Sequence, residues 1–416
     1  MGAEDAYPFR GLRVLDFGVG AVGVEVGRLF AEYGADVIKV ESQARPDFMR
    51  ALTPAWMNPA FASSSRSKRS FAVDLSSERG VGLLHQLVRV SDVVVDNNGA
   101  GVMEKLGVGY EALRATNPRI VVFTSQMVGG QGPWSRWIGY GPSTHPVSGL
   151  QYLWNYPEDA ERPAGSVNIF PDHLVGRIGA LAAVAALIQR ERSGRGCKID
   201  AAQFETPINL LGDLFALEEL APGSLRPAGN RSPRGAPWGI YRCAGPDEWC
   251  AINVRSDAEW EALRRALGSP DWSGRPEYRT ASGRLAHQDE LDARLGEWTA
   301  DRTPQEVAQR LQAEGVPAGD VQHAAHQLAD PQLAARGYAR VVDQPGVGGM
   351  VFEGPSFRGT DLPEPIIGPA PLLGQHTREV ARELLGLSEP EIDALVAEGV
   401  LEEARPFEGA PGWGQA

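Results

Sequence analysis

The chain has 416 residues, a net charge of −13, 43% hydrophobic residues and 22% charged residues. This length favours two domains over one small core, and the composition is that of an ordinary globular protein. The acidic balance argues against a nucleic-acid-binding surface, which needs clustered basic residues.

The cysteines and the apolar runs indicate the cellular compartment that we expect for the protein. Cys197, Cys243 and Cys250 are few, odd in number and not in metal-ligand spacing, so we expect a reducing compartment and no metal site. No apolar run reaches the length of a membrane span, and the short acidic start does not resemble a signal peptide. We therefore expect a cytoplasmic protein with neither nucleic-acid nor membrane partners.

The N-terminal third alternates short apolar strands with helices. We predict strands at 13–17, 35–41, 71–74, 93–96 and 120–125, and helices at 24–33, 80–90 and 110–115. This alternation predicts an α/β fold with a parallel sheet covered on both faces, similar to a doubly wound nucleotide fold.

A glycine pattern follows the first predicted strand. Gly18, Gly20 and Gly23 fit the dinucleotide fingerprint, and Glu41 lies at about the distance of its acidic residue. An NAD-dependent enzyme is therefore one alternative. The same glycines equally suit close helix–strand packing or the approach of another phosphate or thioester ligand.

The carboxylate of Asp172 lies just ahead of a long apolar helix, which we predict from Leu174 to Gln189. Small apolar residues suit a helix that is buried on most of its faces. The free N–H groups at the start of that helix would lie beside Asp172. Two interpretations remain open: Asp172 is an N-cap with a structural role only, or it is a functional carboxylate.

The second half of the chain differs from the first in composition and in its pattern of predicted helices and strands. Residues 1–210 form the first predicted domain, and the Pro- and Gly-rich stretch 211–237 is a predicted linker. A small α+β domain follows at 238–318, with a hairpin of 238–241 and 249–254 and helices at 259–267, 289–300 and 304–314. Residues 319–403 are a predicted return segment with strands at 349–358 and a helical stretch at 376–400, and 404–416 a frayed tail.

Many segments together resemble the class III CoA-transferase family, which includes formyl-CoA transferase, carnitine CoA-transferase and α-methylacyl-CoA racemase. Their order and spacing over most of the chain carry the resemblance, more than any single motif. The matching segments include residues 11–16, 34–41, 67–70, 101–107, Gly139-Tyr140, Asp172, 190–196, 236–241, 315–319 and 371–377.

The resemblance implies a Rossmann-like large domain completed by the C-terminal segment, with a small domain inserted. It also implies two chains interlocked as rings in an obligate homodimer, or a hetero-oligomer with a homologous subunit as in some relatives. The implied substrates are an acyl-CoA and a small carboxylic acid, with coenzyme A as a cosubstrate and no permanently bound cofactor.

The resemblance also implies the chemistry. Asp172 matches the family's nucleophile, which forms a mixed anhydride and then an aspartyl-CoA thioester. Tyr140 matches a tyrosine near the transferase site, where the racemases carry a proton-abstracting histidine, so racemization is the alternative reaction. His145 and His173 are nearby bases that we expect to be structural or to contact substrate. Gly18, Gly20 and the turn 129–132 are candidate oxyanion donors.

The position of the family's CoA site implies a set of contact residues in this chain. These are Asn97, Val102, Lys105, Leu106, Arg45 and Val73, with Lys68 and Arg69 as further candidates. The chain departs from formyl-CoA transferase where Ala21 replaces a substrate-contacting glutamine and Asn98 replaces a phenylalanine. These departures argue against oxalate or formate as substrate, and the stretch 141–156 looks more like relatives that act on bulkier, partly aromatic acids.

Overall fold

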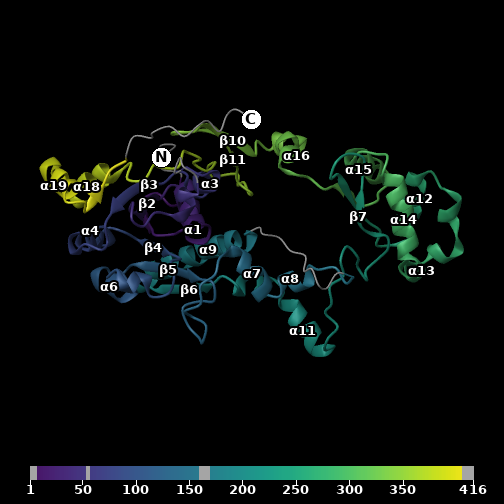
Figure 1. Cartoon of the computed structure of the whole chain (residues 1–416), viewed down its shortest axis with the longest axis horizontal. Coiled ribbons are helices and arrows are strands. Elements are labelled where there is room, and N and C mark those ends of the chain that lie inside the picture. The colour runs from purple at the N-terminus through teal and green to yellow at the C-terminus, as the bar shows by residue number, and fades with distance from the viewer. Residues whose placement is uncertain (1–6, 53–56, 159–168, 405–416) are drawn as a thin grey trace. The chain divides into compact units, whose positions relative to one another are not determined.

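The computed structural model describes residues 7–52, 57–158 and 169–404. The chain divides into two compact units (Figure 1). Unit 1 comprises residues 1–150, 166–216 and 334–416, and unit 2 comprises residues 151–165 and 217–333.

Unit 1 is built on a seven-stranded sheet in the order β12-β3-β2-β1-β4-β5-β6. All neighbours pair in parallel except β12, which is antiparallel to β3. The strand order reverses between β1 and β4, which is the switch point where doubly wound sheets bind ligands. The strands are β1 (Arg13–Asp16), β2 (Asp36–Glu41), β3 (Arg69–Val73), β4 (Val93–Asp96), β5 (Val121–Gln126), β6 (Lys198–Ala202) and β12 (Leu401–Glu402).

Helices cover both faces of this sheet, as the alternating pattern predicts. On one face, Val22, Val26 and Phe30 of α1 pack with α9 in one apolar core, and the second core lies on the other face under α4 and α18. The helices of unit 1 are α1 (Val22–Glu32), α2 (Phe48–Ala51), α3 (Pro59–Ser65), α4 (Glu78–Arg89), α5 (Val102–Lys105), α6 (Tyr110–Thr116), α7 (Gly141–Val147), α9 (Phe170–Ser193), α10 (Glu205–Leu210), α18 (Thr377–Leu385) and α19 (Glu389–Ala397). Helices α8 (Leu150–Leu153) and α11 (Gly212–Leu220) each begin in unit 1 and end in unit 2.

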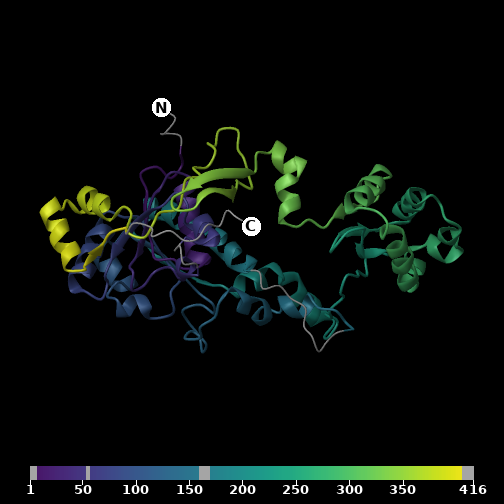
Figure 2. The same cartoon turned by 45° about the horizontal axis from the view of Figure 1, so that its top comes forward.

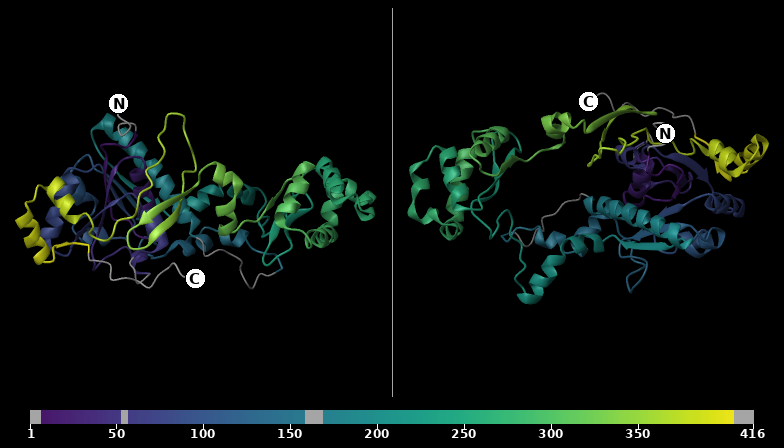
Figure 3. Two further views of the ribbon diagram at one scale, coloured as in Figure 1. Left: turned by 90° about the horizontal axis from the view of Figure 1, so that it is seen from above. Right: turned by 180° about the vertical axis from the view of Figure 1, so that it is seen from behind.

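Helix α9 lies along α1 (Figure 3). Gly176 permits the close approach, because a Cβ there would lie 2.6 Å from the Cβ of Glu25. The expectation that no apolar run reaches the length of a membrane span is wrong for α9, whose 24 residues have the length and hydropathy of one. Half of its most apolar window is buried within the chain, as is usual for the core helix of a globular protein.

The C-terminal segment completes unit 1 (Figure 2). The hairpin of β10 (Ala339–Gln344) and β11 (Gly348–Glu353) packs Val342 and Phe352 against Phe61 of α3. Leu401 of β12 then pairs with Val73 of β3. The predicted helical stretch at 376–400 is two helices, α18 and α19, because Gly386 adopts a left-handed conformation between them.

Unit 2 has a three-stranded sheet in the order β7-β8-β9, with helices over a core around Trp260 and Tyr278. Its elements are β7 (Trp238–Arg242), β8 (Trp249–Asn253), β9 (Ala318–Asp320), α12 (Asp257–Leu267), α13 (Ala281–Ala286), α14 (Gln288–Thr299), α15 (Pro304–Ala313), α16 (Ala324–Ala329), α17 (Pro331–Ala335) and two 3₁₀ turns, Asp271–Gly274 and Pro276–Arg279.

The unit boundaries differ from the predicted domain boundaries at three places. Residues from 151 to 158, inside the first predicted domain, belong to unit 2. The predicted linker 211–237 contains α11, and residues from 217 onwards belong to unit 2. The return to unit 1 begins at 334 and not at 319, because β9 pairs with β8 and so belongs to the small sheet.

Candidate active site

Two loops meet at the switch point of the sheet, one after β1 and one after β4. Asn97 fixes them together, because its Oδ1 accepts from the Val19 N–H at 2.8 Å and its Nδ2 donates to the Val19 carbonyl at 2.9 Å. The side chain of Asn97, which we predicted to contact CoA, therefore holds the loop at Val19 in place.

A cavity of about 250 Å³ opens beside these loops within unit 1. It brings together the two predicted catalytic residues, Asp172 and Tyr140. The remaining lining residues are Val19, Gly20, Ala21, Val22, Phe48, Asn97, Asn98, Gly99, Gln126, Met127, Trp137, Ile138, Gly139, Gly141 and Gln203.

Asp172 lies in the first turn of α9, and the N-cap is Ile169. The interpretation of Asp172 as an N-cap is therefore wrong, because the helix begins at Phe170, four residues earlier than predicted. The side chain is 7% exposed, and its Oδ1 is buried without a hydrogen-bond partner among the described residues. Burial raises the pKa of Asp172 to about 6, with a smaller opposing effect from His173.

Gly141 packs directly against the other carboxylate oxygen. A Cβ at this position would lie 2.5 Å from Oδ2 of Asp172, so only glycine fits here. Tyr140, the residue before it, is 65% exposed and stacks edge-on against Phe48 at 5.8 Å. Tyr140 thus lies at the rim of the cavity and not under the carboxylate.

A second, smaller pocket of about 70 Å³ lies next to the cavity. Four of the predicted CoA contacts line it: Arg45, Val73, Val102 and Leu106. Val19 and Asn98 line both spaces, so the pocket and the cavity share a wall. Lys105 is exposed on α5 and lines neither space.

The other basic candidates are committed to ion pairs. Lys68 is buried, and its Nζ contacts Asp16 Oδ2 at 2.7 Å, while burial lowers its pKa to about 8. Arg69 pairs with Asp36 and with two carboxylates of α18. Neither residue lines the pocket, so their proposed CoA contact is not supported.

Residues of the predicted dinucleotide fingerprint contact other parts of the chain itself. Glu41, placed to bind a ribose, is buried and accepts three hydrogen bonds from Arg50. Gly18 packs against α1, where a Cβ would lie 2.4 Å from the Val24 nitrogen. Gly18 and Gly23 therefore serve close packing of the loop against α1, which is one of the two other interpretations of the pattern, while Gly20 lines the cavity.

Most of the predicted oxyanion donors already have partners within the chain. The N–H groups of Gly18 and Gly20 donate to Asp16 at 2.7 Å and Asp47 at 3.1 Å, and that of Gly130 donates to Asp200. The cavity instead exposes Ala21 and Val22 at the start of α1. Backbone N–H groups at the start of a helix have no intrahelical acceptor and favour negative charge.

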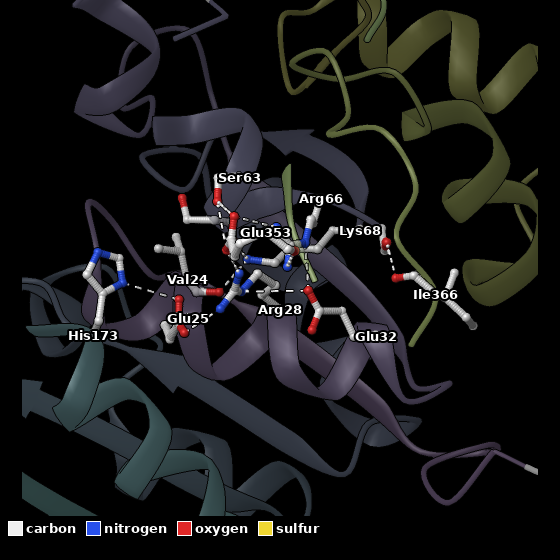
Figure 4. A network of polar contacts seen from close by, with 12 residues as sticks. Val24, Glu25, Arg28, Glu32, Ser63, Arg66, Lys68, His173, Glu353 and Ile366 are labelled. Carbon is white, nitrogen blue, oxygen red and sulfur yellow. Dashed lines mark hydrogen bonds and ion pairs between the residues drawn. The ribbon is translucent and has the colours of Figure 1, made fainter. Parts of the chain in front are cut away.

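His173 is held away from the cavity by a charged network (Figure 4). Its Nδ1 lies 3.3 Å from Glu25 Oε2, and Glu25 also pairs with Arg28. Burial alone would raise the pKa of Glu25, but His173 and Arg28 bring it down to about 2. His145 is buried against Phe170 and does not line the cavity either. Neither histidine therefore lines the cavity that holds Asp172.

The network continues to the C-terminal segment. Arg66 is buried and joins Glu32 at 2.6 Å and Glu353 at 3.0 Å, and Glu353 also pairs with Arg28 (Figure 4). Because Glu353 ends β11, these ion pairs attach the return segment to α1 and α3. This network therefore couples the start of α9 to the hairpin through α1.

One group in unit 2 offers metal-ligand atoms. Glu248, His323 and His326 place one such atom each within 4.8 Å of one another. The Glu248 Oε1 lies 3.7 Å and 3.9 Å from the two imidazole Nε2 atoms, as in a carboxylate–imidazole pair. None of the three lines the cavity that holds Asp172.

Sequence reasoning missed much of the cavity wall. Phe48, Met127, Trp137, Ile138 and Gln203 line it, and no motif marks them. The run of aromatic residues between 134 and 140, in a loop without strand or helix periodicity, was the available signal for two of them.

The sequence and fold of the chain match those of known proteins. Residues 9–377 match the profile of CoA-transferase family III. The chain is 37% identical over 409 residues to a probable CoA-transferase of Mycobacterium tuberculosis, covering 96% of this chain and 51% of that protein. It therefore spans about half the length of that relative.

Another relative matches along its whole length. The succinyl-CoA–D-citramalate CoA-transferase of Chloroflexus aurantiacus is 32% identical over 403 residues, covering 95% of this chain and 98% of that protein. Among solved structures, a CaiB/BaiF family protein from Brucella suis superimposes with a TM-score of 0.82 at 29% identity, covering 91% of this chain and 99% of that one. The chain is thus an enzyme of CoA-transferase family III, with that family's mixed α/β fold around a parallel sheet.

Proposed function

We propose that this chain moves CoA from an acyl-CoA thioester to a carboxylic acid, with Asp172 as the nucleophile. The observation that carries the proposal is a buried carboxylate with an unpartnered oxygen, facing a cavity at the switch point of the sheet. Its pKa of about 6 leaves it mostly ionised at neutral pH and more basic than an exposed carboxylate.

The transfer proceeds by acyl exchange without a change in oxidation state. The carboxylate of Asp172 attacks the thioester carbonyl, the C–S bond breaks, and a mixed anhydride and the CoA thiolate form. The thiolate then attacks the Asp172 carbonyl carbon, which releases the first acid and leaves an aspartyl-CoA thioester. The incoming carboxylate attacks the carbonyl of that thioester, the C–S bond breaks, and a second mixed anhydride and the CoA thiolate form. The thiolate then attacks the carbonyl of the second acyl group, which gives the new acyl-CoA and releases the Asp172 carboxylate.

The N–H groups at the start of α1 are placed to stabilise the oxyanions of these steps. Ala21 and Val22 line the same cavity as Asp172 and belong to a helix of 11 residues. Donors fixed before the reaction stabilise developing charge without reorganisation. Tyr140, at the rim, closes over the acyl group and has no proton-transfer role in this scheme.

We infer that CoA binds in the pocket that shares Val19 and Asn98 with the cavity. Val73, Val102 and Leu106 give an apolar surface there, and Arg45 is a lining cation without an ion pair to any described residue. The pantetheine arm would then cross the shared wall to bring the thioester to Asp172. Lys105 can add a positive charge near the phosphates from α5.

We also propose a homodimer in which the two chains interlock. Helix α9 exposes Ile178, Leu181 and Ile188 on a face that the rest of the described chain leaves uncovered. Such exposed apolar side chains on a core helix fit a partner surface. Two relatives are named as alpha and beta subunits of a succinyl-CoA–L-malate CoA-transferase, so a homologous partner chain is the alternative.

The test of the nucleophile is chemical trapping. Incubation with an acyl-CoA and hydroxylamine should convert Asp172 to a hydroxamate, which peptide mass spectrometry detects, and Asp172→Asn should abolish both labelling and transfer. Asp301→Asn, at an exposed turn of unit 2, is the matched control and should behave as the unmodified chain. Undiminished transfer by Asp172→Asn would refute the proposal. Sedimentation of a compact, active monomer would refute the dimer alone.

A further inference from the structure

The wall of the Asp172 cavity is apolar and aromatic. Phe48, Met127, Trp137, Ile138 and Tyr140 reach it from three separate segments of unit 1. Four of them are at least 40% exposed, and only Met127 is buried. Large apolar side chains left open to solvent around a nucleophile mark a surface that an apolar ligand covers.

The loop before α7 holds this surface in place. The rings of Trp134 and Trp137 stack at 4.9 Å with an interplanar angle of 15°. Tyr140 packs edge-on against Phe48 at 5.8 Å. Flat aromatic faces that are fixed by such pairs present a platform on which a planar or branched hydrocarbon group can pack.

The described part of the cavity wall offers no cationic side chain to pair with an anionic substrate tail. Among its described lining residues, Asp172 is the only charged one, and none is Lys, Arg or His. The amide nitrogens of Asn97, Asn98 and Gln126 donate to backbone carbonyls of the chain itself, so Gln203 is the one lining amide side chain without a hydrogen bond to the described residues. A second carboxylate in this space would be desolvated beside Asp172 without a partner, which is unfavourable on both counts.

We infer that the substrates of this site are monocarboxylic acids with an aromatic or branched apolar chain, and that dicarboxylic acids are excluded. The inference rests on the proposed transferase function and specifies its substrate class. Trp137 and Ile138 are the residues that set the preference, because they lie at the rim where the tail of the acyl group would extend. The reacting carbonyl stays at Asp172 for either class of acid.

The test compares acceptors that share the reacting carboxylate. With one acyl-CoA donor, 3-phenylpropanoate should be used at least 100-fold more efficiently than succinate, as judged by kcat/KM. Trp137→Ala should lower kcat/KM for 3-phenylpropanoate, through KM, about tenfold more than it lowers kcat/KM for propanoate. A preference for succinate, or an equal loss for both monoacids in Trp137→Ala, would overturn the inference.

A charge-introducing variant tests the electrostatic half separately. Ile138→Arg places a cation at the exposed rim and should raise kcat/KM for succinate at least tenfold. Ile138→Gln, of similar length and neutral, is the matched control and should not. No gain for succinate in Ile138→Arg relative to Ile138→Gln would refute the role of the missing counter-charge.

Hydroxylamine trapping keeps this inference distinct from the function on which it rests. Labelling of Asp172 by succinyl-CoA and not by 3-phenylpropanoyl-CoA would overturn the substrate class and retain the nucleophile. Labelling by neither thioester would overturn both proposals. Labelling by 3-phenylpropanoyl-CoA alone is the expected result.

Discussion

Replacing Asp172 by Asn should stabilise the protein at neutral pH while it abolishes transfer. Burial raises the pKa of Asp172 from 3.8 to about 6, so the folded state binds a proton that the unfolded state has released between these pH values. Stability from the protonated carboxyl is therefore fully present below pH 3.8 and is lost as the pH rises through about 6. Asparagine never ionises and escapes this loss.

The size of the effect follows from the shift. At 1.36 kcal/mol for each pKa unit, the ionised carboxylate costs roughly 3 kcal/mol at pH 8 and roughly 0.5 kcal/mol at pH 4. The side chain is 7% exposed, so solvent screening reduces this figure little. The amide of asparagine adds a hydrogen-bonding cost of its own, which does not depend on pH and cancels in the difference between the two pH values.

The assay is urea unfolding at pH 4 and pH 8, at one fixed protein concentration because any dimerisation makes the midpoint concentration-dependent. The free energy of unfolding of Asp172→Asn, minus that of the unmodified chain, should be about 2.5 kcal/mol larger at pH 8 than at pH 4. Asp96→Asn should show the same sign, because burial also raises the pKa of Asp96 to about 6. Asp301→Asn, at an exposed turn of unit 2, is the control for an Asp→Asn substitution away from the cavity. A flat difference for Asp172→Asn would refute the burial argument.

Four further results are expected. The kcat/KM for transfer should fall about tenfold per unit below pH 6, because a protonated Asp172 cannot attack, and a profile flat to pH 4.5 would contradict this. Arg45→Ala should raise the KM for acyl-CoA about tenfold with kcat nearly unchanged, and steady-state kinetics in which KM stays constant would exclude Arg45 from the CoA site. Gly141→Ala should cost at least 100-fold in kcat, since its Cβ would lie 2.5 Å from Oδ2; full activity with normal circular dichroism would show that the carboxylate can move aside. Arg66→Ala should destabilise unit 1 by about 3–5 kcal/mol in urea unfolding, because Glu32 and Glu353 lose a buried partner, and a loss under 1 kcal/mol would mean the network relaxes.

The central strands were predictable because each is a short apolar run beside a helix of its own. The Val93–Asp96 strand and the Val121–Gln126 strand were found within one or two residues for this reason. Strand β6 was not predicted: its sequence Lys198–Ala202 mixes polar and apolar residues, as suits an edge position, and its partner β5 lies far back in the chain. Pairing over such separations leaves little local signal.

The site was predictable in part for a related reason. Asp172, Tyr140 and the pocket residues Val73, Val102 and Leu106 came from a family resemblance that reports position along the chain. The hydrogen-bond partners of Gly18, Gly20 and Lys68 could not be predicted, since each depends on side chains that only the fold brings near. The aromatic wall of the cavity could not be predicted for the same reason, because it brings Phe48 together with Trp137 and Tyr140, which are far from it in sequence.

Strand β12 has a consequence for how the protein is made. Its partner β3 ends at residue 73, and about 330 residues must still be synthesised before β12 exists, which at about 5–20 residues per second takes roughly 16–65 seconds. During that interval one border of the growing sheet carries unpaired backbone groups, and such a border recruits strands from other molecules. A chain that stops just before residue 401 never forms β12, and this border then stays unpaired. Its yield should therefore fall through aggregation, even though it lacks no residue that lines the cavity.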